Sequence, residues 1–142
     1  MDKVYIDCDI ILDLLSKREP FFKSAESLFS MAEREEINAY VSPLIFANLF
    51  YILRKSTSNA KARDTLIKLK LLVDVLPVNE KITELALASE FQDFEDAVHY
   101  YTALENGIHY LITRNKKHYK NPELTICTAE EFVKSKKVRI GP

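Results

Sequence analysis

The sequence predicts a three-layer α/β/α fold, in which a central parallel sheet of about five strands lies between two layers of helices. Short apolar runs alternate with longer segments of helical periodicity, and this alternation is typical of a parallel sheet covered on both faces. The 142 residues fit one domain. Because no internal repeat, low-complexity tract or linker interrupts the pattern, we expect a single domain over residues 1–142.

The predicted strands are short apolar runs, each bounded by turn or capping residues. They cover residues 4–7, 38–41, 75–78, 109–113 and 124–127. Runs of this length are too short for stable helices, so we assign all five to the sheet.

The segments between the strands carry apolar residues at helical spacing and begin at capping signals. Helices are expected at residues 10–17, 21–35, 43–54 and 59–72, from 79 onward, at 93–106 and at 128–135. Ser42 and Pro43 supply an N-cap hydroxyl and a proline at the first helical position. Thr128 and Glu131 form a capping box for the last helix. Residues 135–142 are expected to form a basic C-terminal tail.

Composition and charge restrict the class of protein. No segment reaches the roughly 20 apolar residues of a membrane span, and Met-Asp-Lys does not open a secretory signal, so we expect a cytoplasmic protein with no membrane partner. Cys8 and Cys127 match neither a zinc motif nor a disulfide framework, as expected of buried thiols in a reducing cytoplasm.

The net charge of −1 conceals a segregation of charge along the chain. Residues 79–105 are mostly acidic, whereas basic residues cluster at 54–70, 114–120 and 134–139. Basic surfaces around an acidic site suit a metal-assisted enzyme that acts on a polyanion. Any single charged run is more typical of a solvated helix face, however.

Three polar residues are expected to share one edge of the sheet. Asp7 ends the first strand and Asn115 follows the fourth, and ligands of parallel sheets bind beyond the carboxyl ends of the strands. Asp96 lies in the first turn of its helix, where the helix dipole favours a carboxylate. These residues therefore form the candidate site.

Three other acids are expected to have local roles. Asp93 is predicted to cap the helix that carries Asp96, and Asp9 to cap a helix beginning at Ile10. Asp13 falls one helical turn later and is expected to face water. Such roles are needed in this apolar run because a buried, unpaired carboxylate costs several kcal/mol or becomes protonated.

Three segments of the chain also resemble a known family. They are IDCDIILDLL at residues 6–15, SPLIFANLFYIL at 42–53 and DFEDAVHYYTALENGIHYLITRN at 93–115. In order and spacing they resemble the PIN domain, and the resemblance covers nearly the whole chain. It implies a small α/β protein with a parallel sheet. It also implies a Mg²⁺- or Mn²⁺-dependent ribonuclease, since many PIN domains have this activity and many bacterial and archaeal members are toxins of toxin–antitoxin pairs.

The resemblance further implies an acidic metal pocket. The family builds this pocket from an Asp after the first strand, a Glu in the following apolar helix and two later Asp residues. At the matching positions this chain has Asp7, Asn48, Asp96 and Asn115, so that asparagine replaces two of the acids. Thr113 matches the small hydroxyl residue that is common two positions before the last acid.

Two carboxylates are enough for weak binding of one metal ion. Mg²⁺ keeps several waters and is usually held by one or two carboxylates and substrate phosphate. We therefore expect Asp7 and Asp96 to bind Mg²⁺ or Mn²⁺ and catalysis to proceed through metal-activated water. Asn115 and Thr113 are expected to position that water or a second ion. The supporting pocket is expected to comprise Asn48, Asp9 and Asp93.

Basic residues that follow the fourth strand are expected to bind RNA. Arg114, Lys116 and Lys117 would contact flanking phosphates, so affinity should fall with salt. Single-stranded or looped RNA is the expected substrate, and Tyr119 is a candidate for stacking on its bases. As partners, the family resemblance implies an antitoxin protein and a second copy of the chain in a homodimer.

Two other functions fit parts of the sequence. Because Asn48 and Asn115 replace acids, a PIN-like domain that binds RNA or protein without cleaving is the main alternative. The segment Asp7-Cys8-Asp9 also resembles the nucleophile motif of haloacid-dehalogenase-type phosphatases. That resemblance is weaker, since Ile11 stands where those phosphatases favour Thr and the chain leaves little room for a cap domain.

Overall fold

The computed structural model describes residues 1–120 and 122–140 and contains the predicted alternation of strands and helices. The strands are β1 (Asp2–Ile6), β2 (Ile37–Val41), β3 (Asp74–Val75), β4 (Tyr110–Ile112) and β5 (Thr125–Cys127). The helices are α1 (Cys8–Leu15), α2 (Phe22–Glu33), α3 (Pro43–Ser56), α4 (Asn59–Lys70), α5 (Glu80–Ala88), α6 (Phe94–Glu105), the short 3₁₀ helix η1 (Lys116–His118) and α7 (Ala129–Ile140).

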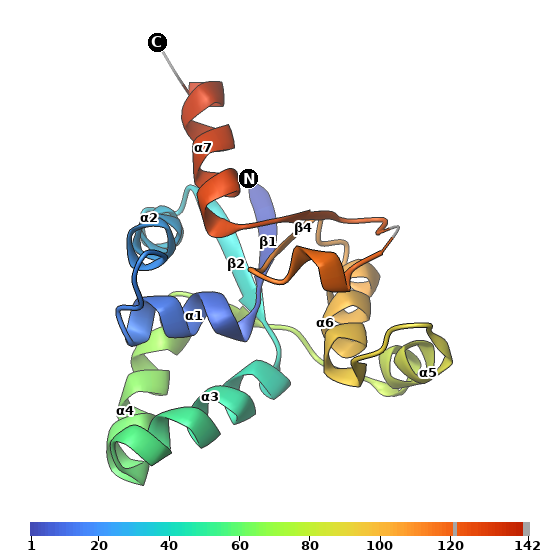
Figure 1. The fold of residues 1–142 in the computed structure, drawn as a ribbon, viewed down its shortest axis with the longest axis horizontal. Coiled ribbons are helices and arrows are strands. Elements are labelled where there is room, and N and C mark those ends of the chain that lie inside the picture. Colours follow the sequence, from blue (N-terminus) through green and yellow to red (C-terminus); the bar gives the residue numbers. More distant parts are fainter. Residues whose placement is uncertain (121, 141–142) are drawn as a thin grey trace.

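The five strands form one parallel sheet in the order β3-β2-β1-β4-β5. Figure 1 shows α1 and α2 on one side of this sheet and α5 and α6 on the other, which confirms the three-layer α/β/α prediction. Helix α7 contacts α2, and α3 and α4 form a pair that contacts α1. Successive strands are added outward from β1, first β2 and β3 on one side and then β4 and β5 on the other. The topological switch point of the sheet therefore lies where β1 and β4 end side by side.

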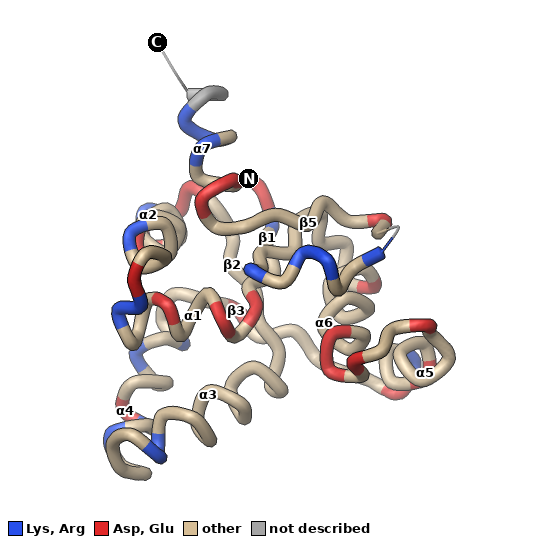
Figure 2. The backbone as a smooth tube through the Cα atoms, viewed as in Figure 1, with Lys and Arg blue, Asp and Glu red and all other residues tan. Residues whose placement is uncertain are grey.

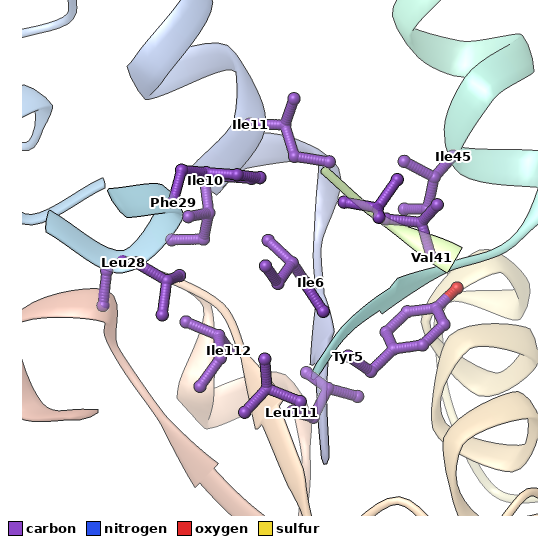
Figure 3. Packing of buried hydrophobic residues seen from close by; sticks show 14 of the residues in the cluster. Tyr5, Ile6, Ile10, Ile11, Leu28, Phe29, Val41, Ile45, Leu111 and Ile112 are labelled. Carbon is purple, nitrogen blue, oxygen red and sulfur yellow. The ribbon is translucent and has the colours of Figure 1, made fainter. Parts of the chain in front are cut away.

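The central strand β1 explains why its sequence is apolar without alternation. Val4, Tyr5 and Ile6 are fully buried because helices cover both faces of the strand. In Figure 3, Ile6 points toward α1 and α2, near Ile10 and Leu28, whereas Tyr5 points to the opposite face. Burial of each large apolar side chain of this kind contributes about 1.5–3 kcal/mol to folding. The strand that directly precedes Asp7 is thus held firmly in the core.

The boundaries of two helices differ from the sequence prediction. Helix α1 begins at Cys8 instead of Ile10, because Asp7 itself is the N-cap and its side chain accepts a hydrogen bond from the backbone N–H of Cys8. The prediction that Asp9 caps this helix is therefore wrong. Helix α7 continues to Ile140 instead of ending at Ser135, so the predicted tail is helical as far as the structure describes it. Residues 141 and 142 lie outside the described residues.

None of the helices within the described ranges, 1–120 and 122–140, is long and apolar enough to cross a membrane. The longest of them, α3, has 14 residues, fewer than the roughly 20 that a membrane span needs.

Candidate active site

The carboxylate of Asp7 is fixed between the ends of β1 and β4. The backbone N–H of Asp7 donates to the carbonyl of Ile112 at 3.0 Å, which extends the pairing of the two strands by one residue. Its Oδ1 accepts a hydrogen bond from the N–H of Cys8 at 2.7 Å, and its Oδ2 accepts one from the hydroxyl of Thr113 at 2.9 Å. Asp7 therefore lies at the sheet edge predicted for it, and Thr113 contacts it there.

Asp9 and Asn115 lie together beside this pair. The Asn115 side-chain amide donates to Asp9 Oδ2 at 3.3 Å, and the backbone N–H of Arg114 donates to the same oxygen at 3.2 Å. The other oxygen, Oδ1, is buried and has no hydrogen-bond partner. Burial, followed by the negative charge of Asp7, raises the pKa of Asp9 to about 6. Asp9 thus lies beside Asn115 and the backbone of Arg114, and its supporting role stays a prediction.

Asp96 approaches the pocket from the start of α6. Asp93 caps this helix by accepting a hydrogen bond from the N–H of Asp96 at 3.1 Å, which confirms the predicted cap. The pKa of Asp96 is raised by its burial and by the charges of Asp93 and Asp7, so the acids repel one another. Figure 2 shows acidic residues at the starts of both α1 and α6.

The structure adds His118 to the residues predicted for the site. His118 lies in η1, and its Nδ1 is 3.0 Å from Asp96 Oδ2. This contact partly offsets the repulsion by lowering the pKa of Asp96. Its position three residues after Asn115, in the loop that follows β4, was the available signal for it in the sequence. The sequence did not indicate a role for His118, because the neighbouring lysines characterise this segment only as basic.

Asn48 faces Glu95 across the gap between α3 and α6. The Asn48 side-chain amide donates to Glu95 Oε1 at 2.5 Å. The partner of Asn48 is thus a carboxylate that belongs to the same helix as Asp96, and the predicted role of Asn48 in the pocket stays a prediction.

Asp13 and Arg114 form a pair behind the pocket, and the expectation that Asp13 faces water is wrong. Asp13 is only 1% exposed, and its Oδ2 lies 3.0 Å from Arg114 Nε. The guanidinium also stacks on the ring of Phe21, with 4.1 Å between its carbon and the ring centre. Arg114 therefore points toward the protein interior, and its predicted contact with RNA phosphate stays a prediction.

The two lysines of this segment differ in their surroundings. Lys116 pairs with Glu131 of α7 at 2.9 Å, whereas Lys117 is exposed. The predicted contacts of both lysines with RNA phosphates stay predictions.

Tyr119 is buried, so the suggestion that it stacks on RNA bases from the surface is wrong. It is 5% exposed and packs against the rings of Phe91 and Tyr100. Its hydroxyl group is buried without a hydrogen-bond partner. Burial, followed by the charges of Asp7 and Asp96, raises the pKa of this hydroxyl.

The residues of the pocket fit a well-hydrated divalent ion. Within residues 1–120 and 122–140, no three His, Cys, Asp or Glu side chains converge closely enough to form a metal cage. Asp7 and Asp96 nevertheless supply the one or two carboxylates that Mg²⁺ usually takes from a protein. The unpartnered oxygens of Asp9 and Tyr119 add polar groups that could bind its water. Mutual repulsion of the carboxylates is a further reason why a cation would be stabilised here.

Comparisons with known proteins agree with this geometry. A family model described as the PIN domain matches residues 3–117. Ribonuclease VapC1 of Aquifex aeolicus is 24% identical over 136 residues, which cover 92% of this chain and 93% of that protein.

Two solved structures have the same fold. The DNA-bound VapBC of Salmonella typhimurium superimposes with a TM-score of 0.69 at 16% identity, covering 91% of this chain and 99% of that one. A toxin–antitoxin complex from Klebsiella pneumoniae gives a TM-score of 0.67 at 21% identity, with coverages of 89% and 97%. Since the family model spans most of the sequence and the fold agrees, the chain belongs to the PIN domain family.

Proposed function

We propose that this PIN domain is a metal-dependent endoribonuclease and the toxin of a toxin–antitoxin pair. The observation that carries the proposal is the Asp7–Thr113 contact at the sheet edge, with Asp96 facing the same pocket. The similarity to a protein named ribonuclease VapC1 and to toxin–antitoxin complexes supports it.

In this mechanism the residues of the chain hold the reacting groups in place. Asp7 and Asp96 would bind Mg²⁺ or Mn²⁺, which when bound supplies an activated water and offsets charge on the phosphate. Thr113 keeps the Asp7 carboxylate in one orientation through its hydrogen bond. Asn115 orients water beside Asp9, and His118 keeps Asp96 directed into the pocket.

The exposed side of the pocket would bind the RNA backbone. Lys117 is exposed next to it, and Lys116 would have to exchange Glu131 for a phosphate. Arg114 contributes charge to the field around the pocket while its guanidinium stays with Asp13. We therefore expect Lys117 to contribute most to the salt dependence of RNA binding.

Cleavage of a single-stranded RNA by purified protein, with and without Mn²⁺, tests the proposal. The variants D7N and D96N should each lower the cleavage rate at least 100-fold. Mutation of a residue that only hydrogen-bonds to a metal ligand already lowers activity by about 10–100-fold, and a ligand itself should matter more. Asn caps helices as well as Asp does, so D7N should keep the cap of α1. The matched control is D64N, which removes one exposed carboxylate from α4, far from the pocket in the sequence.

Cleavage that does not depend on metal, or that survives in both variants, contradicts the proposal. RNA binding without cleavage favours the alternative, a PIN-like binding module. The observation in favour of that alternative is the replacement of two acids by Asn48 and Asn115 and the lack of a preformed metal cage in the described residues. The phosphatase alternative is dropped, because the second acid of its motif, Asp9, is bound to Asn115 and the chain is a PIN domain.

The antitoxin would bind an apolar groove between α3 and α4. Its lining consists of the apolar residues Phe46, Phe50, Leu66, Ile67 and Val75 and the basic residues Arg63 and Lys70. This combination suits an amphipathic segment with acidic residues along one side. A homodimer of this chain belongs to the same proposal, and light scattering of the purified protein would test it.

A further inference from the structure

The position where the family resemblance expects an acid on α3 is occupied by Asn48, which binds a carboxylate from another helix. The Asn48 amide donates to Glu95 Oε1 at 2.5 Å. Glu95 belongs to the first turn of α6, directly before Asp96. The carboxylate of Glu95 is thus hydrogen-bonded to the residue at which the family has an acid on α3, although α3 itself carries no acid there.

A buried histidine, His99, also contacts Glu95 Oε1. His99 Nε2 lies 3.3 Å from Glu95 Oε1, and His99 is fully buried. An ionised carboxylate only accepts hydrogen bonds, so Nε2 must carry the proton. The other ring nitrogen, Nδ1, is 2.7 Å from the Tyr5 hydroxyl, which is 2.9 Å from the hydroxyl of Ser42. This chain of contacts fixes the ring and directs Glu95, even though the Glu95 side chain is 46% exposed.

His99 also connects Glu95 to the strand that ends before Asp7. Tyr5, whose hydroxyl lies 2.7 Å from His99 Nδ1, belongs to β1 and precedes Asp7 by two residues. Tyr119 directly follows His118, which contacts Asp96, and it is only 5% exposed while its hydroxyl has no hydrogen-bond partner. A buried polar group without a partner is a second observation that points to a ligand or its water here.

We propose that Glu95, presented by Asn48 and His99, supplies the third negative charge of the metal pocket in place of an acid on α3. Asn48 and His99 are then positioning residues. Because no three acids converge in the described residues, Glu95 binds the hydrated ion through a water molecule. This inference rests on the proposed function, since it concerns the metal that the nuclease would use.

The contribution of Glu95 can be measured as the affinity of the RNA-free protein for Mn²⁺, determined by calorimetric titration. We expect E95Q to weaken Mn²⁺ binding by about tenfold. Removing a group that orients metal ligands typically weakens binding by about 10–100-fold, and a contact through water should lie at the lower end. The matched control is E105Q on the same helix, which removes an equal charge at the far end, where Glu105 pairs with Lys81. E105Q should bind Mn²⁺ as the wild type does.

The double variant N48E/E95Q separates a charge contribution from a structural one. It returns a carboxylate to α3 and removes the one on α6, so it should regain most of the affinity and the cleavage rate lost in E95Q. Unchanged affinity in E95Q overturns the inference, and so does a loss that N48E fails to restore. If the Glu95 inference is overturned in either way but D7N still abolishes Mn²⁺ binding, the proposed nuclease function is retained. A wild type that neither binds Mn²⁺ nor cleaves RNA overturns both.

Discussion

The pocket has two flanks that are built in different ways. The strand flank consists of residues at the ends of β1 and β4 and the first turn of α1, namely Asp7, Asp9, Thr113 and Asn115. The helix flank consists of residues on α3, α6 and η1, namely Asn48, Glu95, Asp96 and His118. Backbone pairing of β1 with β4 places the strand flank, whereas side-chain contacts between separate helices place the helix flank.

This difference predicts how each flank responds to substitution. The strand flank is continuous with the core, so damage to it should affect folding and activity together. His118 and Glu95 are 44% and 46% exposed, so substitutions there should change activity and leave stability intact. The following variants test this contrast.

The largest effect is expected behind the strand flank. R114A leaves the carboxylate of Asp13 buried and unpaired, so the free energy of unfolding should fall by roughly 3 kcal/mol. Urea unfolding measures it. The control is R114K, which keeps a positive charge but loses the stacking on Phe21 and should lose less. A change in R114A below about 0.5 kcal/mol, as for ordinary surface substitutions, would mean that Asp13 does not need this partner.

The next effect concerns the hydrogen bond that holds Asp7. T113V removes the hydroxyl that donates to Asp7 Oδ2 at a fully buried position, and cleavage should slow by about 10–100-fold. Unfolding should also become easier, by about 1–3 kcal/mol, because a buried acceptor loses its donor. T113S keeps the hydroxyl and should retain most of the activity. If T113V and T113S behave alike in both assays, the hydroxyl does not orient Asp7.

On the helix flank, H118A should reduce activity without a loss of stability. The variant removes the group that contacts Asp96 Oδ2, and a loss of about tenfold in cleavage is expected. The temperature of unfolding should stay within error of the wild type. A clear drop in this temperature would show that the helix flank is as tightly coupled to folding as the strand flank.

The smallest expected effect is a gradual change with pH in the free energy of unfolding, caused by Asp13. Burial raises the pKa of Asp13 despite the charge of Arg114, so the folded state keeps this proton to higher pH than the unfolded state. As pH rises above the unfolded value of about 3.9, the ionisation of Asp13 should lower the free energy of unfolding. In urea titrations from pH 4 to pH 7, the wild type should therefore lose stability relative to D13N. The opposite slope would mean that Arg114 outweighs burial.

The sequence was sufficient to predict the sheet and the position of Asp7 at its edge. Apolar runs mark each strand to within three residues, and Asp7 and Thr113 meet because parallel strands place their carboxyl ends at one edge. The two-residue β3 is shorter than predicted because only Asp74 and Val75 are in register with β2.

Contacts that depend on the path of a loop could not be predicted in this way. Arg114 turns back to Asp13 and His118 reaches Asp96 only because of how the chain runs after β4. Asp9 was misassigned because α1 starts directly after β1, with no residue between Asp7 and the helix. The partnership of Asn48 with Glu95 depends on the packing of α3 near α6, for which the sequence carries no local signal.

The order of the strands has a consequence for the synthesis of the protein. Asp7 leaves the ribosome well before its partner Thr113, which follows 106 residues later. At translation rates of about 5–20 residues per second, at least five seconds or so separate the two halves of the strand flank. A nascent chain therefore carries no assembled pocket until β4 has been made. Premature termination anywhere before that strand would yield a fragment without the site.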